Sequence, residues 1–87
     1  MKIQRDNLSF GEALQFLWDN PEWYLTCDRY INDDKNGTVL TFKDADTPGD
    51  AYLVSYSYRD GKLRNDFKTT VMGRMMKEKW KIVELDK

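Results

Sequence analysis

Arg29 is the side chain with the clearest capacity to bind an anion. Residues 23–31 alternate as a strand does, which places Arg29 on the same face as the apolar Cys27. A guanidinium in an apolar setting can bind a phosphate or a carboxylate through two parallel hydrogen bonds. A surface arginine at a sheet edge is the alternative interpretation. Together with two aromatic rings of the same segment, the predicted ligand-binding residues are Trp23, Arg29 and Tyr30.

The residues that most enzymes use for catalysis are scarce. The chain has no histidine and a single cysteine, Cys27, on an apolar strand face. A catalytic thiol needs a base and an electropositive setting, so we interpret Cys27 as a core residue. Asn32–Gly37 resembles the start of a calcium loop, but Lys43 stands at the twelfth position, where a bidentate glutamate belongs. The sequence therefore predicts a protein that is not an enzyme and uses no metal or cofactor.

Tyrosines alternate along one predicted strand, and such rings can stack on nucleic-acid bases. The Asp60-Gly61 dipeptide predicts a two-residue hairpin turn after this strand, because both residues tolerate positive φ. The turn gives the tyrosines a face shared with Val54 and Phe67, which favours core packing over a stacking platform. The predicted opposite pairs are Tyr58 with Leu63, Tyr56 with Asn65, and Val54 with Phe67.

The elements that position these residues can be read from local signals. Ser9 and Glu12 form a capping box that begins a helix, and Asn20-Pro21 ends it. Strand patterns then occupy residues 23–31, 38–43 and 51–59, and continue after the Asp60-Gly61 turn. Thr70 is expected to cap a short second helix, and the last strand is expected at residues 80–85.

The predicted fold class is α+β, in a single domain of residues 1–87. An N-terminal helix, an antiparallel sheet of about five strands and a short helix before the last strand make up the fold. Both helices are expected to cover one face of the sheet. On the second strand, Leu40 and Phe42 are expected in the core, and Thr41 and Lys43 in water.

Charge is divided unevenly along the chain. Residues 1–50 carry five basic and ten acidic side chains, and residues 51–87 carry nine basic and five acidic ones. This division suits a homo-oligomer with complementary surfaces or a basic face for an anionic partner, and solvated faces without a partner are the alternative. The net charge of −1 argues against a nucleic-acid binder. The predicted partner-binding residues are Phe16, Arg64, Lys68 and Arg74.

The sequence is also informative about the cellular compartment. One cysteine cannot form an internal disulfide, which is typical of a reducing environment. No segment approaches the ~20 apolar residues that a membrane span requires. We therefore expect a cytoplasmic protein without membrane contact.

The two ends of the chain together resemble those of a small phage-encoded family. The opening Phe10–Leu17 matches a helix that begins Phe-Gly-Glu-Ala-Leu, and the closing Met75–Glu84 matches a short helix leading to Trp-x-Ile-Val-Glu. The family includes Thoeris anti-defence proteins, which sequester a cyclic ADP-ribose signal, and an anti-CRISPR inhibitor of Cas9. The matching positions cover about twenty residues, whereas residues 20–29 and Lys79 depart from the family pattern.

The resemblance implies an accessory protein of phage or prophage type that acts by binding. Its expected role is counter-defence, either by sequestering a nucleotide signal or by blocking a bacterial defence protein, in the cytoplasm of the host cell. Inhibition of another host enzyme is one alternative. A nucleic-acid-binding accessory module that uses Lys62, Arg64, Lys68 and Arg74 is the other.

Overall fold

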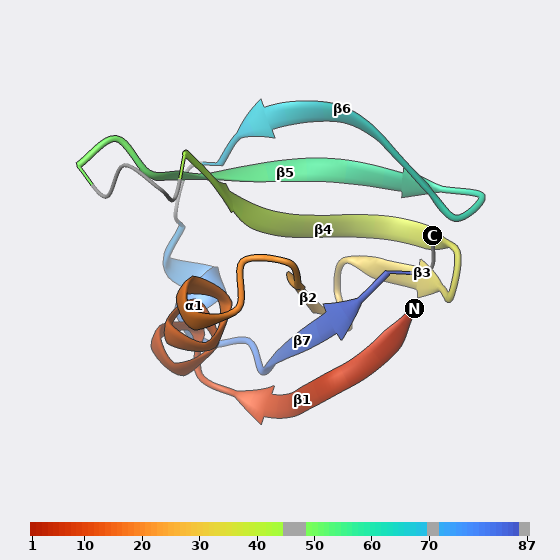
Figure 1. Cartoon of the computed structure of the whole chain (residues 1–87). Helices are drawn as coiled ribbons and strands as arrows, with labels where there is room; N and C mark the ends of the chain where they lie inside the picture. The colour runs from red at the N-terminus through yellow and green to blue at the C-terminus, as the bar shows by residue number, and fades with distance from the viewer. Residues whose placement is uncertain (45–48, 70–71, 86–87) are drawn as a thin grey trace.

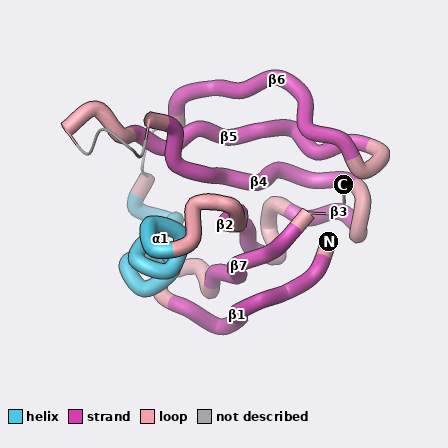
Figure 2. Tube along the Cα trace, viewed as in Figure 1, coloured by secondary structure: helices cyan, strands magenta, loops and turns pink. Residues whose placement is uncertain are grey.

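The computed structural model describes residues 1–44, 49–69 and 72–85. Those residues form an α+β fold with one α-helix and an antiparallel sheet (Figures 1 and 2). In chain order the elements are β1 (Lys2–Leu8), α1 (Phe10–Asp19), β2 (Tyr24–Cys27), β3 (Ile31–Asp33), β4 (Asn36–Lys43), β5 (Tyr52–Arg59), β6 (Lys62–Lys68), the 3₁₀-helix η1 (Gly73–Met76) and β7 (Trp80–Glu84).

The sheet has seven strands among the described residues, so the expected number of about five is wrong. Its order is β1-β7-β2-β4-β5-β6, with β3 paired to β4. The first additional strand, β1, has a polar sequence that carries no alternating pattern, and it forms because it pairs with β7. The second arises because the predicted strand 23–31 is interrupted by a turn at residues 28–30, where the Tyr30 N–H donates to the Cys27 carbonyl. The first correction comes from a pairing partner far away in the sequence, and the second comes from a local turn that separates β2 from β3.

Helix α1 begins and ends as predicted. The Ser9 hydroxyl accepts from the Glu12 N–H at 3.2 Å, and the Glu12 carboxylate accepts from the Ser9 N–H at 3.0 Å. The hydrogen bond from the Ser9 N–H, and after it an interaction with the Ser9 side chain, lower the pKa of the Glu12 carboxyl below its ordinary value. The helix ends at Asp19, and Asn20 is its C-cap, immediately before Pro21. The expected second helix is the 3₁₀-helix Gly73–Met76, and its predicted cap, Thr70, lies outside the described residues.

The hydrophobic core lies between α1 and one face of the sheet. Leu25 pairs with both Leu40 and Ile82, so three neighbouring strands turn apolar side chains to the same side. Helix α1 contacts β1, β2, β4, β7 and η1 from that side. Leu40 is buried, as predicted, and Phe42 packs against the core as a half-buried residue. The fully buried cluster is Phe10, Ala13, Leu17, Leu25, Cys27, Leu40, Met75, Trp80 and Ile82.

The other face of the sheet is also partly buried. Thr41, expected in water, is only 9% exposed, and its hydroxyl donates to the Trp23 carbonyl at 3.4 Å. Val39 and Val54 on the same face are buried, and Tyr58 is 1% exposed. The reason is curvature, because the sheet curls until the end of β7 lies near the β5–β6 hairpin (Figure 1). Alternation along a strand does not report such curvature.

The β5–β6 hairpin confirms the predicted turn but not the whole register. Asp60 and Gly61 have φ of 52° and 76°, and Tyr58 pairs with Leu63. A β-bulge then follows at Asn65, whose φ is 50°. Beyond it Tyr56 pairs with Asp66 and Val54 with Lys68, and Phe67 turns to the opposite face, where it pairs with Ser55. The predicted pairs Tyr56–Asn65 and Val54–Phe67 are therefore wrong by one residue.

Gly37 gives a direct test of this packing. It lies on β4 between Ile31 and Tyr58, and a Cβ there would be 2.6 Å from the Tyr30 carbonyl oxygen. We expect Gly37→Ala to lower the free energy of unfolding by about 1–3 kcal/mol, because backbone has to move. Urea denaturation monitored by tryptophan fluorescence measures the change.

The matched control is Gly11→Ala in α1. Gly11 is exposed, and a Cβ there meets no heavy atom within 4 Å. The same substitution should therefore stabilise the protein, by about 0.4–1 kcal/mol, through helix propensity and the entropy of the unfolded chain. Equal effects at the two glycines would contradict the close approach of β3 to β4.

Candidate functional site

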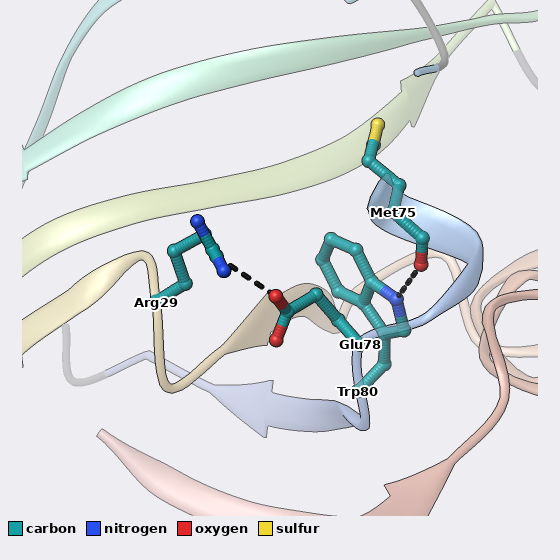
Figure 3. Close-up of polar contacts among 4 residues, drawn as sticks. All are labelled: Arg29, Met75, Glu78 and Trp80. Atoms are coloured by element: carbon teal, nitrogen blue, oxygen red, sulfur yellow. Dashed lines mark hydrogen bonds and ion pairs between the residues drawn. The ribbon is translucent and has the colours of Figure 1, made fainter. Parts of the chain in front are cut away.

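Arg29 does not lie on an apolar strand face. Strand β2 ends at Cys27, so the alternation that placed Arg29 beside Cys27 stops before reaching it. The side chain is 57% exposed, and its Nε donates to Oε1 of Glu78 at 2.8 Å (Figure 3). The guanidinium therefore pairs with a carboxylate of the same chain, and the predicted apolar anion clamp is absent at this residue.

The other two predicted ligand-binding residues are separated from each other. Trp23 is half-buried against the core at the start of β2, and Tyr30 follows the end of that strand. The Tyr30 ring lies edge-on to Trp80 with the centroids 5.6 Å apart. The four residues of β2, roughly 13 Å of extended chain, lie between them. The structure thus brings Arg29 close to Tyr30 in one turn but does not bring Trp23 to them.

The predicted partner-binding residues fall on separate surfaces. Arg64 and Lys68 are exposed on β6, and Arg74 is exposed on η1. Phe16 lies on α1, half-buried, with the Arg5 guanidinium 5.4 Å from its ring centroid. The ring also lines a hollow of about 230 Å³ whose other residues are Glu12, Gln15 and Asp19, so this hollow has an acidic lining.

Strand β6 forms one edge of the sheet and carries a basic surface. All seven of its residues are exposed, including Phe67 at 65% and Leu63 at 37%. We call Lys62, Arg64 and Lys68 the basic edge. The one carboxylate on this strand, Asp66, is held at 2.7 Å by Lys43 of β4. That hydrogen bond lowers the pKa of Asp66 and raises the pKa of Lys43.

Next to the basic edge lies a tyrosine on the curved face of the sheet. The Lys68 ammonium is 5.3 Å from the centroid of the Tyr52 ring, and Tyr52 pairs with Lys43 in the adjacent strand. Tyr52 and Tyr56 are half-buried, whereas Tyr58 is buried. The interpretation of the tyrosines as core residues thus holds fully for Tyr58 and in part for the other two.

A larger hollow, of about 430 Å³, opens where the curled sheet brings its corners together. We call it the sheet-corner hollow. It lies between the start of β2, the end of β7 and the β5–β6 hairpin. Sequence reasoning missed it, since no local pattern relates these three segments. It is lined by Glu22, Tyr24, Tyr58, Gly61, Lys62, Leu63, Glu84 and Leu85.

Tyr24, which lines this hollow, has a raised pKa. Burial raises the pKa of its phenol above the ordinary value of 10.0, and the nearby Tyr56 adds to the shift. The residue pairs with Val83 and turns toward the curved face of the sheet. Tyr24 is therefore a neutral aromatic wall at physiological pH.

The remaining chemistry of the described residues is limited. Cys27 is buried, as predicted, and burial raises the pKa of its thiol against hydrogen bonds from the Arg29 and Tyr30 N–H groups. Within residues 1–44, 49–69 and 72–85, no group of three or more acidic or cysteine side chains is arranged to hold a metal ion. None of the helices in these ranges is long and apolar enough to cross a bilayer.

Comparison of the chain with protein-family models, curated proteins and solved structures finds no match. The resemblance of the chain ends to the phage family consequently stays a prediction.

The raised pKa of Tyr24 has a measurable consequence at alkaline pH. Above pH 10 the unfolded chain releases this proton while the folded chain retains it, so stability falls as the pH rises toward the folded-state pKa. We expect Tyr24→Phe to reduce this alkaline loss of stability. The difference in tyrosinate absorbance between the parent and the variant should show a titration above pH 10. A midpoint at or below 10 would contradict the burial of this phenol.

Proposed function

We propose that this protein acts by binding, and that the basic edge engages an acidic surface of a bacterial protein. The observation that carries the proposal is the exposure of the whole of β6 at one edge of the sheet. No β6 side chain belongs to the core cluster of the described residues, so the strand's cations contribute little to folding through their side chains. They are available to a partner.

The positive charge of the basic edge indicates an acidic partner. Lys62, Arg64 and Lys68 stand against a single carboxylate on β6, and Lys43 already pairs with that carboxylate. A cluster of one sign attracts a surface of the opposite sign and speeds its association. The exposed Phe67 ring, on the same face of β6 as Arg64, adds an apolar anchor, as aromatic residues do at interfaces.

The same edge is poorly suited to pairing with its own copy. Strand edges that avoid self-association carry lysines and bulges, and β6 has both, with its bulge at Asn65. Two copies of β6 side by side would bring like charges together. The homo-oligomer expected from the sequence stays a prediction, and its complementary route would join the basic edge to the acidic hollow around Phe16.

The biological role that agrees with this surface is counter-defence. The terminal resemblance is to phage proteins that act by binding, and an acidic patch on a defence protein would be the target. The protein would act without catalysis in the cytoplasm of the host cell. The absence of histidine and the burial of the single cysteine support a non-enzymatic role.

Reversing the charge of two residues of the basic edge should weaken binding of the partner. We expect Arg64→Glu with Lys68→Glu to weaken the partner by about ten- to a hundredfold, since each reversal replaces an attraction by a repulsion. Affinity capture from bacterial lysate, followed by titration of the purified partner, measures this. The double variant should also lose protection of phage in a strain that carries the defence system.

The matched control reverses two exposed lysines elsewhere, Lys2→Glu with Lys77→Glu. This control makes the same change in net charge and should bind as the parent does. Equal binding by the two double variants, or no partner enriched by the parent chain, would refute the proposal.

A second candidate function, capture of a nucleotide signal, is favoured by the contact between Lys68 and Tyr52. A half-buried ring next to a cation can stack on a base while the cation faces a phosphate. This pair would take the place of Trp23, Arg29 and Tyr30, which the fold does not gather into one site.

A thermal-shift screen tests nucleotide capture. A cyclic nucleotide at a hundred times its Kd should stabilise the folded chain by about 2.7 kcal/mol. Lys68→Gln should reduce that shift, and the exposed Lys35→Gln should not. If no nucleotide stabilises the folded protein, the second candidate fails while the basic edge is unaffected.

A further inference from the structure

We infer that the sheet-corner hollow is a binding site for a small organic cation, an ammonium or guanidinium group on an apolar stem. Its lining includes the aromatic residues Tyr24 and Tyr58 and the acidic residues Glu22 and Glu84. This site shares Lys62 with the basic edge, but it involves neither Arg64 nor Lys68, so the variants that test the two proposals are different.

The size of the hollow suits a small ligand. Pockets that bind small molecules have volumes of about 300–1,000 Å³, and this one has about 430 Å³. It is open on one side, where Glu22 and Lys62 are exposed, and closed on another by Tyr58, which is 1% exposed. A ligand can therefore enter from solvent and meet an apolar wall.

The charge of the lining favours a cation. The lining includes two glutamates and one lysine, Lys62, and so carries an excess of one negative charge. Glu84 accepts a hydrogen bond from the Gln4 amide at 2.9 Å, which holds its carboxylate in place without neutralising it. A phosphorylated ligand would have to approach both carboxylates. The hollow is thus a poor site for the nucleotide considered above.

The aromatic rings favour the same ligand class. Cations bind over the faces of tyrosine rings, and the attraction increases when water is excluded. Tyr24 is half-buried, so its ring is partly removed from water and can still meet a ligand, whereas Tyr58 is 1% exposed and closes the hollow. The raised pKa of Tyr24 keeps its ring neutral and its hydroxyl able to donate. An apolar stem would pack against Leu63 and Leu85, the aliphatic residues of the lining.

Chemical-shift titration of the isotope-labelled full chain tests the proposal, with agmatine as the probe. We expect saturable shifts at the backbone amides of Tyr24, Gly61 and Glu84. Glu22→Gln and Glu84→Gln should each weaken agmatine by about three- to fivefold, the size expected of an exposed ion pair. Lys62→Gln should strengthen it by a similar factor, because a like charge is removed.

The control variant is Asp50→Asn, which removes an exposed carboxylate outside the hollow and should leave agmatine binding unchanged. Thermal melts of all four variants should match the parent, since all four residues are exposed. The proposal is overturned if agmatine gives no saturable shift. It also fails if Lys62→Gln weakens the ligand and the two glutamine variants strengthen it, because that pattern identifies an anion site.

A second arm identifies the source of the cation. A short blocked peptide with one arginine carries the same guanidinium as agmatine on a polypeptide. Tighter binding of the peptide would assign the hollow to an arginine of a partner protein, and tighter binding of agmatine would assign it to a free amine. Both results support a cation site.

Discussion

The indole of Trp80 is the interaction on which the rest of the structure depends. Its Nε1 donates to the Met75 carbonyl at 2.7 Å in a buried setting, which fixes η1 against the start of β7 (Figure 3). Its ring contacts Phe10 of α1 at 5.2 Å and Tyr30 at 5.6 Å between centroids. Strand β7 in turn pairs with β1 on one side and with β2 on the other. One side chain therefore joins the helix, the turn after β2 and both ends of the chain.

The parts of the fold that could be predicted are those determined by neighbours in sequence. The capping box of Ser9 and Glu12 and the Asp60-Gly61 turn each lie within a few residues, and both are present as expected. Strand β1 could not be predicted, because its polar residues form a strand only when β7 is beside them. The bulge at Asn65 could not be predicted either, because the neighbouring residues do not indicate that an asparagine within a strand has positive φ. One inserted residue then moved Phe67 from the expected core face to solvent.

The candidate sites were less predictable than the fold, for a related reason. The interpretation of Arg29 relied on a strand that ends two residues earlier, at Cys27, so the side chain turned toward Glu78 instead. The exposure of Arg64 was predictable from alternation, whereas Lys68 lies beyond the bulge on the opposite face and is exposed because β6 is an edge strand. The sheet-corner hollow forms because the curved sheet brings three separate segments together. Local periodicity in the sequence predicts neither the curvature nor this proximity.

In the folded chain, ion pairs connect the acidic half of the sequence to the basic half. Three ion pairs, Arg29–Glu78, Lys43–Asp66 and Asp28–Lys81, each join the acidic half of the chain to the basic half. Two of these pairs join a base of the acidic half to an acid of the basic half, so the ion pairs leave the charge difference between the two halves in place. What remains is local: cations along β6, and carboxylates from both halves, Glu22 and Glu84, around one hollow. Because β7 carries Glu84 and begins at Trp80, the packing of that indole also positions one wall of the hollow. The binding surfaces are therefore consequences of the same long-range pairing that closes the fold.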